Sequence, residues 1–310
     1  MSRVVTLLPS ATEIVCALGQ GEHLVGRSHE CDFPAEVQRL PACTAPNLDP
    51  GGSSPDIDGQ VKSLLQRALS IYSLDREALV RLQPDLVVTQ TQCEVCAVSL
   101  ADVEDALAGW LRVRPRLVSL APMVLADLWT DIARVAGAMG VPERGNDLVA
   151  ALKARVQSIA AQAGEAPTRP GVACIEWIEP LMGAGNWIPE MVAMAGGKSL
   201  CGTAGQHSPW LDWEALRAQD PDILLLMPCG FGMEKTREEL HWMQEKPGWA
   251  DLRAVREGRV YCSDGNHFFN RSGPRLVESL EIMAEIIHPA LFNFGHQGLG
   301  WQALQTVPEG

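Results

Sequence analysis

The sequence of 310 residues lacks any apolar stretch long enough to span a lipid bilayer. It also lacks a secretory signal at its start. Met1-Ser2-Arg3 leads directly into residues 4–8, without the longer apolar region and small-residue cleavage site of such signals. We therefore expect no membrane span and a cytoplasmic location as the sequence is written. A periplasmic location is the alternative, if the true start or a signal is missing from this sequence.

Clusters of lysine and arginine are also missing. The chain carries 38 acidic against 25 basic side chains, which gives a formal net charge of -13. A surface of this kind cannot neutralise a run of phosphates, and anionic lipid headgroups repel it. Nucleic acid and anionic membrane surfaces are therefore excluded as partners.

Sequence motifs of common enzymes are absent as well. There is no glycine-rich phosphate loop, no Gly-x-Ser-x-Gly elbow and no His-Glu-x-x-His pair, which disfavours nucleotide enzymes and hydrolases. The nine cysteines are an odd number and are scattered singly apart from Cys93 and Cys96, a pattern unlike a disulfide framework. This use of cysteine is typical of a reducing compartment.

What the sequence does contain is a motif that occurs once in each half. Residues 74–79 and 84–88 (LDREAL and PDLVV) recur at the same spacing as residues 211–216 and 221–225 (LDWEAL and PDILL). Each copy predicts a capped helix, a Pro-Asp turn and then a buried strand.

Two further motifs repeat in the same order. Residues 12–15 pair with residues 189–192, and each predicts a short helix that is followed four residues later by a glycine. A weaker match pairs residues 116–119 with residues 259–262. Because all three motifs keep their order, the chain is predicted to contain two related α/β lobes.

Residues 147–163 (DLVAALKARVQSIAAQA) predict a long helix, because their apolar residues recur at helical spacing. The predicted fold class is therefore α/β, with two Rossmann-like lobes joined by a single long helix. The expected divisions are residues 1–125 for the first lobe, 126–165 for the connecting helix, 166–290 for the second lobe and 291–310 for a tail of unknown placement.

Several segments taken together resemble one known family. They include the opening VVTLLPSATEIVCALGQGEHLVGRSHECDFP and the later segments GNWIPEMVAMAGG, SPWLDWEAL and GRVYCSDGNHFFNRSGPRLVESLEIMAEIIHP. Their order and spacing are similar to those of the cobalamin and ferric-siderophore substrate-binding proteins of ABC importers. The resemblance implies one ligand held in a cleft between two lobes, no catalysis, and an ABC permease or a corrinoid-handling protein as partner.

In open α/β sheets, ligands bind beyond the carboxyl ends of parallel strands, so residues that follow predicted strands are the site candidates. In the first lobe these include His29, Glu30 and Cys31 after one strand, and Cys93 and Cys96 after another. His29, Cys31, Cys93 and Cys96 would form a tetrahedral set of nitrogen and sulfur ligands for zinc or another soft metal. Packing or ligand lining is the alternative for these cysteines, and a redox pair is disfavoured because no thioredoxin-like tryptophan precedes it.

The second lobe offers mostly aromatic candidates, since flat apolar side chains suit a large conjugated macrocycle with polar groups at its edge. Its predicted ligand-binding residues are Trp177, Trp187, Trp210, His267, Phe268 and Arg271. Aromatic and histidine residues in these motifs, in place of a cluster of arginine and tyrosine, favour the cobalamin branch of the family.

The sequence therefore predicts a binding protein for a corrinoid (cobalamin, vitamin B12) or a related tetrapyrrole. Two alternatives stay open at this point. One is a receptor for a siderophore or another metal chelate. The other is a metal-dependent enzyme that uses His29, Cys31, Cys93 and Cys96, with Glu30 or Glu94 as general base.

Overall fold

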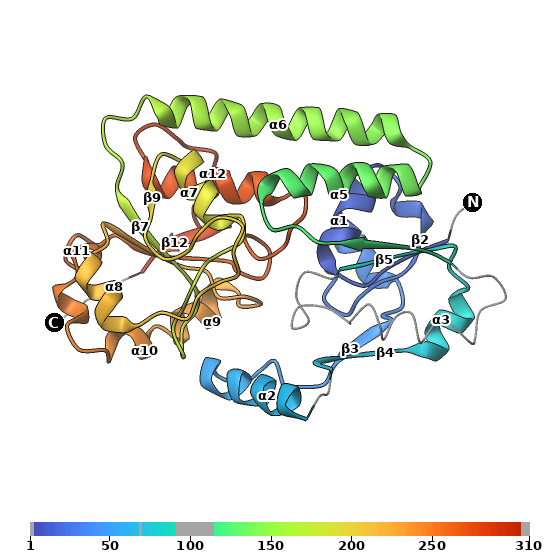
Figure 1. The fold of residues 1–310 in the computed structure, drawn as a ribbon, viewed down its shortest axis with the longest axis horizontal. Helices are drawn as coiled ribbons and strands as arrows, with labels where there is room; N and C mark the ends of the chain where they lie inside the picture. Colours follow the sequence, from blue (N-terminus) through green and yellow to red (C-terminus); the bar gives the residue numbers. More distant parts are fainter. Residues whose placement is uncertain (1–2, 68–69, 91–114, 305–310) are drawn as a thin grey trace. The chain divides into compact units, whose positions relative to one another are not determined.

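The computed structural model describes residues 3–67, 70–90 and 115–304. The chain divides into two compact units, which are described separately below (Figure 1). Unit 1 comprises most of the chain up to Ala151, and unit 2 begins at Leu152 and also takes in the short segments 53–55 and 123–125. The predicted mixed α/β fold is confirmed, with a parallel sheet in each unit.

The central sheet of unit 1 has four parallel strands. In spatial order they are β2 (Leu24–Gly26), β1 (Val4–Thr6), β5 (Leu86–Gln90) and β6 (Arg116–Leu120). Every residue of β1 and β5 is buried, as expected for inner strands of a parallel sheet that is covered on both faces. Val5 of β1 lies opposite Val87 of β5, and both belong to the core.

Helices and a separate two-stranded sheet accompany the central sheet of unit 1 (Figure 1). The small sheet pairs β3 (Thr44–Pro46) with β4 (Tyr72–Leu74) in antiparallel register. Among the described residues, the helices that begin within the first 150 positions are α1 (Pro9–Ala17), η1 (Gly21–His23), η2 (Ala35–Arg39), α2 (Ser54–Gln66), α3 (Arg76–Leu82), α5 (Leu125–Ala138) and α6 (Pro142–Gly164).

The long helix predicted over residues 147–163 is confirmed as part of α6. The connecting segment predicted over residues 126–165 nevertheless contains two helices rather than one. Gly140 adopts a φ of 75°, a conformation that ends a helix and favours glycine, and Pro142 is suited to the first turn of the next helix. The boundary between the two units falls inside α6, after Ala151. The proposed lobe boundaries themselves stay predictions.

Unit 2 has a six-stranded sheet with a parallel centre and antiparallel additions. The parallel strands are β9 (Lys198–Ser199), β7 (Gly171–Trp177), β10 (Ile223–Leu226) and β11 (Val260–Ser263). The antiparallel strands are β8 (Met182–Gly183), which pairs with β7, and β12 (Trp301–Ala303), which pairs with β11. The tail beyond residue 290, which the sequence left unplaced, thus supplies an edge strand to this sheet.

Seven short helices accompany the sheet of unit 2. They are α7 (Ile188–Met194), α8 (Trp213–Gln219), α9 (Met233–Glu238), α10 (His241–Gln244), η3 (Trp249–Asp251), α11 (Arg253–Arg256) and α12 (Leu276–Ile287). Every residue of α12 except Glu278 is buried. Its buried carboxylates therefore need partners, which are described below.

The repeated motifs adopt the same local geometry in both units. Asp75 caps α3 by accepting a hydrogen bond from the Ala78 amide at 2.8 Å, and Asp212 caps α8 through the Ala215 amide at 2.9 Å. The residue after each helix, Gln83 or Asp220, has a φ of 43°. The predicted capped helix, turn and buried strand are thus confirmed in both copies.

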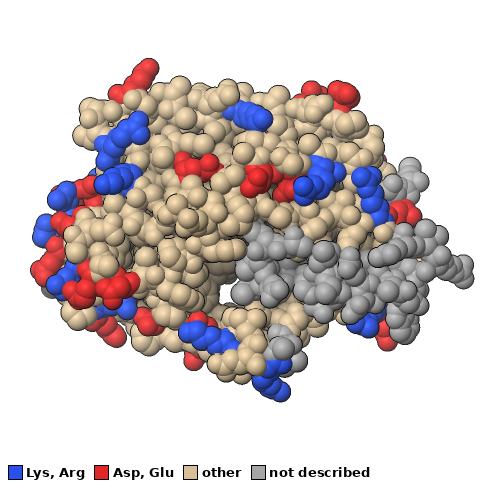
Figure 2. Space-filling view, viewed as in Figure 1, with Lys and Arg blue, Asp and Glu red and all other residues tan. Residues whose placement is uncertain are grey.

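Charged side chains do not gather by sign on the face shown in Figure 2. Among the residues coloured there, lysines and arginines are scattered, and acidic side chains lie beside most of them. In the described ranges, no helix is both long and apolar enough to cross a membrane.

Candidate ligand-binding site

The loop after β2 carries the candidates His29, Glu30 and Cys31 in unit 1. Side chains from the paired strands β3 and β4 hold this loop in place. The Nδ1 atom of His29 lies 2.7 Å from the Thr44 hydroxyl, and that hydroxyl also accepts a hydrogen bond from the His29 amide at 3.0 Å. The Tyr72 hydroxyl donates to Oε1 of Glu30 at 2.9 Å. The centre of the Tyr72 ring lies 5.2 Å from the centre of the His29 ring. Sequence reasoning missed both Thr44 and Tyr72, because they are distant in the chain.

The environment of His29 favours the neutral imidazole. Burial lowers its pKa below the usual value, and the nearby Arg27 guanidinium lowers it further. A neutral imidazole keeps a lone pair, which a metal ligand requires. His29 therefore has the electronic state that the predicted metal site would need.

Cys31 occupies a different environment from His29. Its side chain is 1% exposed, and its Sγ atom accepts a hydrogen bond from the Thr12 hydroxyl of α1 at 3.0 Å. Cys93 and Cys96 lie outside the described residues, so the four-residue metal site is not tested. Within the described ranges, no group of three or more histidine, cysteine, aspartate or glutamate side chains is placed to hold a metal ion.

In unit 2, the loop after β11 brings an aspartate and a histidine together. Oδ2 of Asp264 lies 2.9 Å from Nδ1 of His267, while its Oδ1 accepts hydrogen bonds from the amides of Asn266 at 3.0 Å and His267 at 2.8 Å. Burial alone would raise the pKa of Asp264, but the hydrogen bonds from His267 and Asn266 outweigh it and lower this pKa. Asp264 therefore stays ionised and fixes the orientation of the imidazole ring.

His267 was among the predicted residues, whereas Asp264 was not. The available signal was the spacing Asp-x-x-His directly after a predicted strand, which allows a carboxylate to reach both the backbone and the ring of the histidine.

Phe268 and Arg271 belong to the same loop as His267. The Phe268 ring lies 5.6 Å from the Arg275 guanidinium and 6.4 Å from the His296 ring. Arg271 is 8% exposed, and its guanidinium donates to Oδ1 of Asn266 at 3.0 Å. The structure thus brings together three of the six residues predicted in the second lobe.

A second group of candidates follows β7 and β10. The rings of Trp177 and Phe231 lie 5.1 Å apart with an angle of 54° between them. The Trp177 indole nitrogen is buried and has no hydrogen-bond partner in the described part of the chain. Ser208 donates to the Glu176 carboxylate at 2.8 Å, which ties the loop before α8 to the end of β7. Trp177 therefore offers an indole donor that a ligand acceptor could satisfy.

The other two tryptophans that were predicted to bind ligand differ from each other in burial. Trp187 is 5% exposed, and its indole nitrogen donates to the Phe269 carbonyl at 2.8 Å. A side chain this buried offers little surface to a ligand, so packing accounts for Trp187 better than the predicted ligand contact. Trp210 is 58% exposed, and its backbone pairs with that of Met182.

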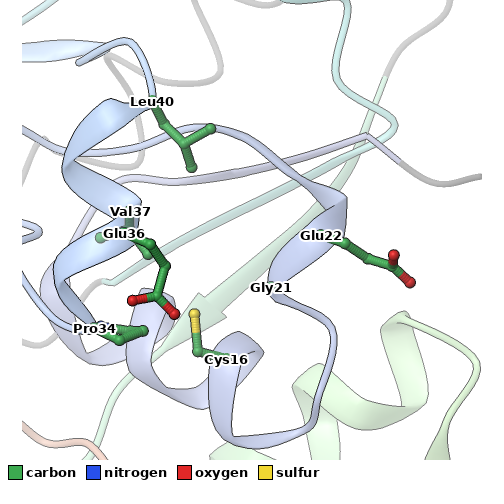
Figure 3. Close-up of a pocket in the computed structure, with 7 residues that line it drawn as sticks. All are labelled: Cys16, Gly21, Glu22, Pro34, Glu36, Val37 and Leu40. Atoms are coloured by element: carbon green, nitrogen blue, oxygen red, sulfur yellow. The ribbon is translucent and has the colours of Figure 1, made fainter.

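Unit 1 also contains a pocket of about 420 Å³ that the sequence did not predict (Figure 3). Figure 3 shows the Cys16 thiol and the Glu36 carboxylate in this pocket. Burial raises the pKa of Cys16 to about 11, and Glu36 and Glu13 add to this effect, so the thiol stays protonated. The pocket is lined by Cys16, Gly21, Glu22, Pro34, Glu36, Val37 and Leu40, none of which belongs to the predicted site.

Two α/β units, each with polar and aromatic side chains in the loops that follow its parallel strands, have the arrangement of a protein that holds a small ligand at its strand ends. Comparison with known families agrees. The chain belongs to the periplasmic binding protein family, whose model matches residues 4–266.

Individual relatives are distant but similar over nearly their whole length. An uncharacterised ABC transporter substrate-binding lipoprotein of Bacillus subtilis (strain 168) is 24% identical over 298 residues, which cover 94% of this chain and 81% of the relative. The vitamin B12-binding protein of Vibrio cholerae is 21% identical over 281 residues, or 90% of this chain and 86% of the relative. The structure of a periplasmic heme-binding protein from Roseiflexus sp. RS-1 matches with a TM-score of 0.70 and 23% identity, covering 94% of this chain and 99% of that one.

Family membership decides three of the expectations from the sequence. The prediction that the chain binds rather than catalyses is confirmed, and the metal-dependent enzyme is set aside, because the family consists of substrate-binding proteins. These proteins work with ABC permeases to import small molecules. The expected cytoplasmic location is not supported, since the relatives are periplasmic proteins or lipoproteins.

Proposed function

We propose that this protein binds a metal-centred tetrapyrrole, with a corrinoid such as cobalamin as first candidate, and delivers it to an ABC permease. The observation that carries the proposal is the Asp264–His267 pair at the end of β11. A carboxylate on Nδ1 is the usual partner of a metal-binding histidine, because it fixes the ring and makes Nε2 more basic. His267 would then meet the metal centre of the ligand through Nε2.

The aromatic side chains near the same strand ends support a macrocyclic ligand. Phe268 adjoins His267 directly, and Trp177 packs against Phe231 at the ends of β7 and β10. Burying one such ring against a ligand contributes on the order of 1–3 kcal/mol. Two of the relatives, named for vitamin B12 and for heme, carry cargo of this chemical class.

The loop after β2 in unit 1 stays a prediction as a ligand-contacting segment. Its His29 and Glu30 side chains are half-buried and are held by Thr44 and Tyr72. An ordered imidazole and carboxylate of this kind suit the amide groups at the edge of a corrin ring. Trp210, Cys31 and Arg271 stay candidates on the evidence of their position alone.

The proposal is tested by titrating the purified protein with hydroxocobalamin, cyanocobalamin and hemin while recording the visible spectrum. Hydroxocobalamin and hemin can accept an imidazole at the metal, and their absorption bands shift when they do. We expect His267→Ala to abolish this shift and to weaken binding by about tenfold or more, which corresponds to about 1.4 kcal/mol. His241→Ala is the matched control, because His241 is exposed on α10 and contacts the Glu238 carbonyl.

Three results separate the ligand classes. Binding of a cobalamin but not of hemin supports the corrinoid, and the reverse supports heme. If neither class binds and ferric siderophores do, the tetrapyrrole proposal is wrong and the siderophore receptor takes its place. If a tetrapyrrole binds equally well to wild type and to His267→Ala, the class stands and the role of His267 does not.

We also propose that the protein acts outside the cytoplasm, as the names of its relatives suggest. Fractionation of cells that express the gene from its natural locus would test this. Recovery of the protein with the cytoplasmic fraction alone would contradict it.

A further inference from the structure

The C-terminal segment, residues 291–304, is attached to α12 through one buried carboxylate. Glu285 is 3% exposed. Its Oε1 atom accepts hydrogen bonds from the backbone amides of Phe294, Gly295 and His296, and its Oε2 atom accepts one from the Trp301 indole at 2.6 Å. Four donors on one buried carboxylate satisfy its charge, and they fix two separate parts of the segment at once.

A second carboxylate on α12 reinforces this attachment. Oε2 of Glu281 lies 2.9 Å from Nε2 of His296, and its Oε1 accepts a hydrogen bond from the Arg155 guanidinium of α6 at 2.7 Å. Glu281 is 8% exposed, so this three-residue ion cluster is screened less than a surface pair would be. The segment is therefore held to two helices of unit 2.

The far end of the segment contacts the loop that carries His267. The Gly300 carbonyl accepts hydrogen bonds from the Ser263 hydroxyl at 2.6 Å and from the Asp264 amide at 3.1 Å. A Cβ atom at Gly300 would lie 2.7 Å from Cδ1 of Ile282 and 3.4 Å from Cε2 of Phe268, so a side chain there would require the Ile282 side chain to shift.

The antiparallel pairing of β12 with β11 fixes the register of these contacts. Trp301 lies opposite Ser263, and Gln302 lies opposite Cys262. Trp301, which anchors the segment to Glu285, thus lies directly across from Ser263, the residue before Asp264.

We propose that the C-terminal segment is a positioning element for the ligand-binding loop. It sets the place of Asp264, which in turn orients the His267 imidazole, and Glu285 is the residue through which the segment is held. This inference rests on the proposed function for its link to ligand binding. Neither Glu285 nor Trp301 touches the ligand, and each acts through Gly300 and Asp264.

The physical reason is the dependence of a metal–ligand bond on geometry. The Asp264 amide and the Ser263 hydroxyl share one acceptor, the Gly300 carbonyl. When the segment detaches, both donors lose this acceptor, and the Asp264 carboxylate becomes free to move relative to β11. An imidazole displaced by about 1 Å loses much of its interaction with a metal centre.

The test uses Trp301→Phe, which removes the indole donor to Glu285 without removing any backbone donor or acceptor of β12. Trp249→Phe is the matched control, because Trp249 is 5% exposed against 7% for Trp301, and its buried indole nitrogen has no hydrogen-bond partner among the described residues. Glu285→Gln is the second variant, which keeps the shape of the side chain and removes its charge. Thermal unfolding of all three shows whether they fold.

The first measurement is backbone hydrogen exchange without any ligand. We expect exchange of the amides at residues 264–268 to rise about tenfold in Trp301→Phe and in Glu285→Gln, the effect of losing about one hydrogen bond's worth of stability. Exchange in β10 should stay unchanged in both, and the loop should stay unchanged in Trp249→Phe. Equal loop exchange in the wild type and in both variants would overturn the inference.

The second measurement is the spectrum of hydroxocobalamin and of hemin at saturation. A lower fraction of imidazole-bound ligand in Trp301→Phe than in Trp249→Phe supports positioning, because a loss of stability alone would not change the spectrum of saturated protein. An unchanged spectrum overturns the link to ligand binding. If the wild type binds neither ligand while loop exchange rises in the variants, the proposed function fails and the coupling between segment and loop stands.

Discussion

The two units carry the same motif but use it differently. Asp85 and Asp222 occupy equivalent places after α3 and α8, and each accepts a backbone amide at the start of a neighbouring strand, from Arg3 at 2.8 Å and from Gly171 at 2.7 Å. Asp222 also binds the Arg253 guanidinium at 2.6 Å, and in the described residues Asp85 has no such ion pair. The repeated motif therefore determines the local turn and its backbone hydrogen bond, while the surrounding unit determines whether the aspartate also forms an ion pair.

The largest effects are expected in the two cores, at Leu79 and Leu216. These residues occupy the same place in the repeated motif, and each is 2% exposed. Replacing either with alanine leaves a cavity, so we expect each substitution to lower the free energy of unfolding by about 2–5 kcal/mol.

Urea denaturation measures this loss, and hydrogen exchange shows where it acts. Leu79→Ala should speed exchange in β5, and Leu216→Ala should speed exchange in β10. Uniform acceleration over both strands by either variant would show that the two units unfold together, which would remove the basis for comparing them separately.

A smaller and equal effect is expected at the two helix caps. Asp75→Ala and Asp212→Ala each remove the acceptor for the first-turn amide of a seven-residue helix. Each should cost about 1 kcal/mol, the usual value for an N-cap aspartate. The midpoint of thermal unfolding gives the comparison, with Asn at the same positions as the conservative control. A cost in one unit only would mean that packing, and not the cap, holds the other helix.

The smallest effect concerns the C-terminal segment of unit 2. Its ion cluster of His296, Glu281 and Arg155 lies outside the repeated motifs. The His296 imidazole faces Glu278, Glu281 and Glu285 on α12, and Arg155 on α6 shares Glu281. The hydrogen bond to Glu281 raises the pKa of His296 above 6.5, although burial opposes this. Burial would raise the pKa of Glu281, but its bonds to His296 and Arg155 lower it below 4.5.

The signs of these shifts define a pH window. The contribution of His296 to the stability of the attached C-terminal segment is complete below pH 6.5, and it is lost as the pH rises through the raised pKa of His296. That of Glu281 is present above pH 4.5 and is lost as the pH falls through its lowered pKa. Protection of residues 294–301 from hydrogen exchange, corrected for intrinsic rates, should therefore be greatest between these values, by less than about 1 kcal/mol. In His296→Gln the decline at higher pH should disappear.

Much of the fold could be predicted from local sequence signals. The Asp caps, the Pro-Asp turns and the apolar strands are each specified within about fifteen residues, and both copies adopt the expected structure. The rule that ligands lie beyond strand ends also brought His267, Phe268 and Arg271 to one loop. These signals are local, so a single sequence is enough to recognise them.

The features that were missed depend on contacts between distant parts of the chain. Trp187 is buried, and its indole donates to the Phe269 carbonyl, 82 residues later in the chain. The tail has no periodic pattern, and its course depends on the carboxylate of Glu285. The break between α5 and α6 was visible as Gly140 and Pro142, but the long apolar pattern outweighed it in the prediction. The interpretation of Cys93 and Cys96 stays a prediction.

The pairing of β12 with β11 has a further consequence for the behaviour of the protein in solution. A parallel sheet that ended at β11 would present a row of unpaired amides and carbonyls, which is a template for another chain to add a strand. A chain shortened to residue 290 is therefore expected to self-associate with rising concentration, as size-exclusion chromatography would show, whereas the full chain would not. The three-residue strand β12 covers that row of hydrogen-bonding groups and becomes the new edge, which is too short to be a good template for another strand.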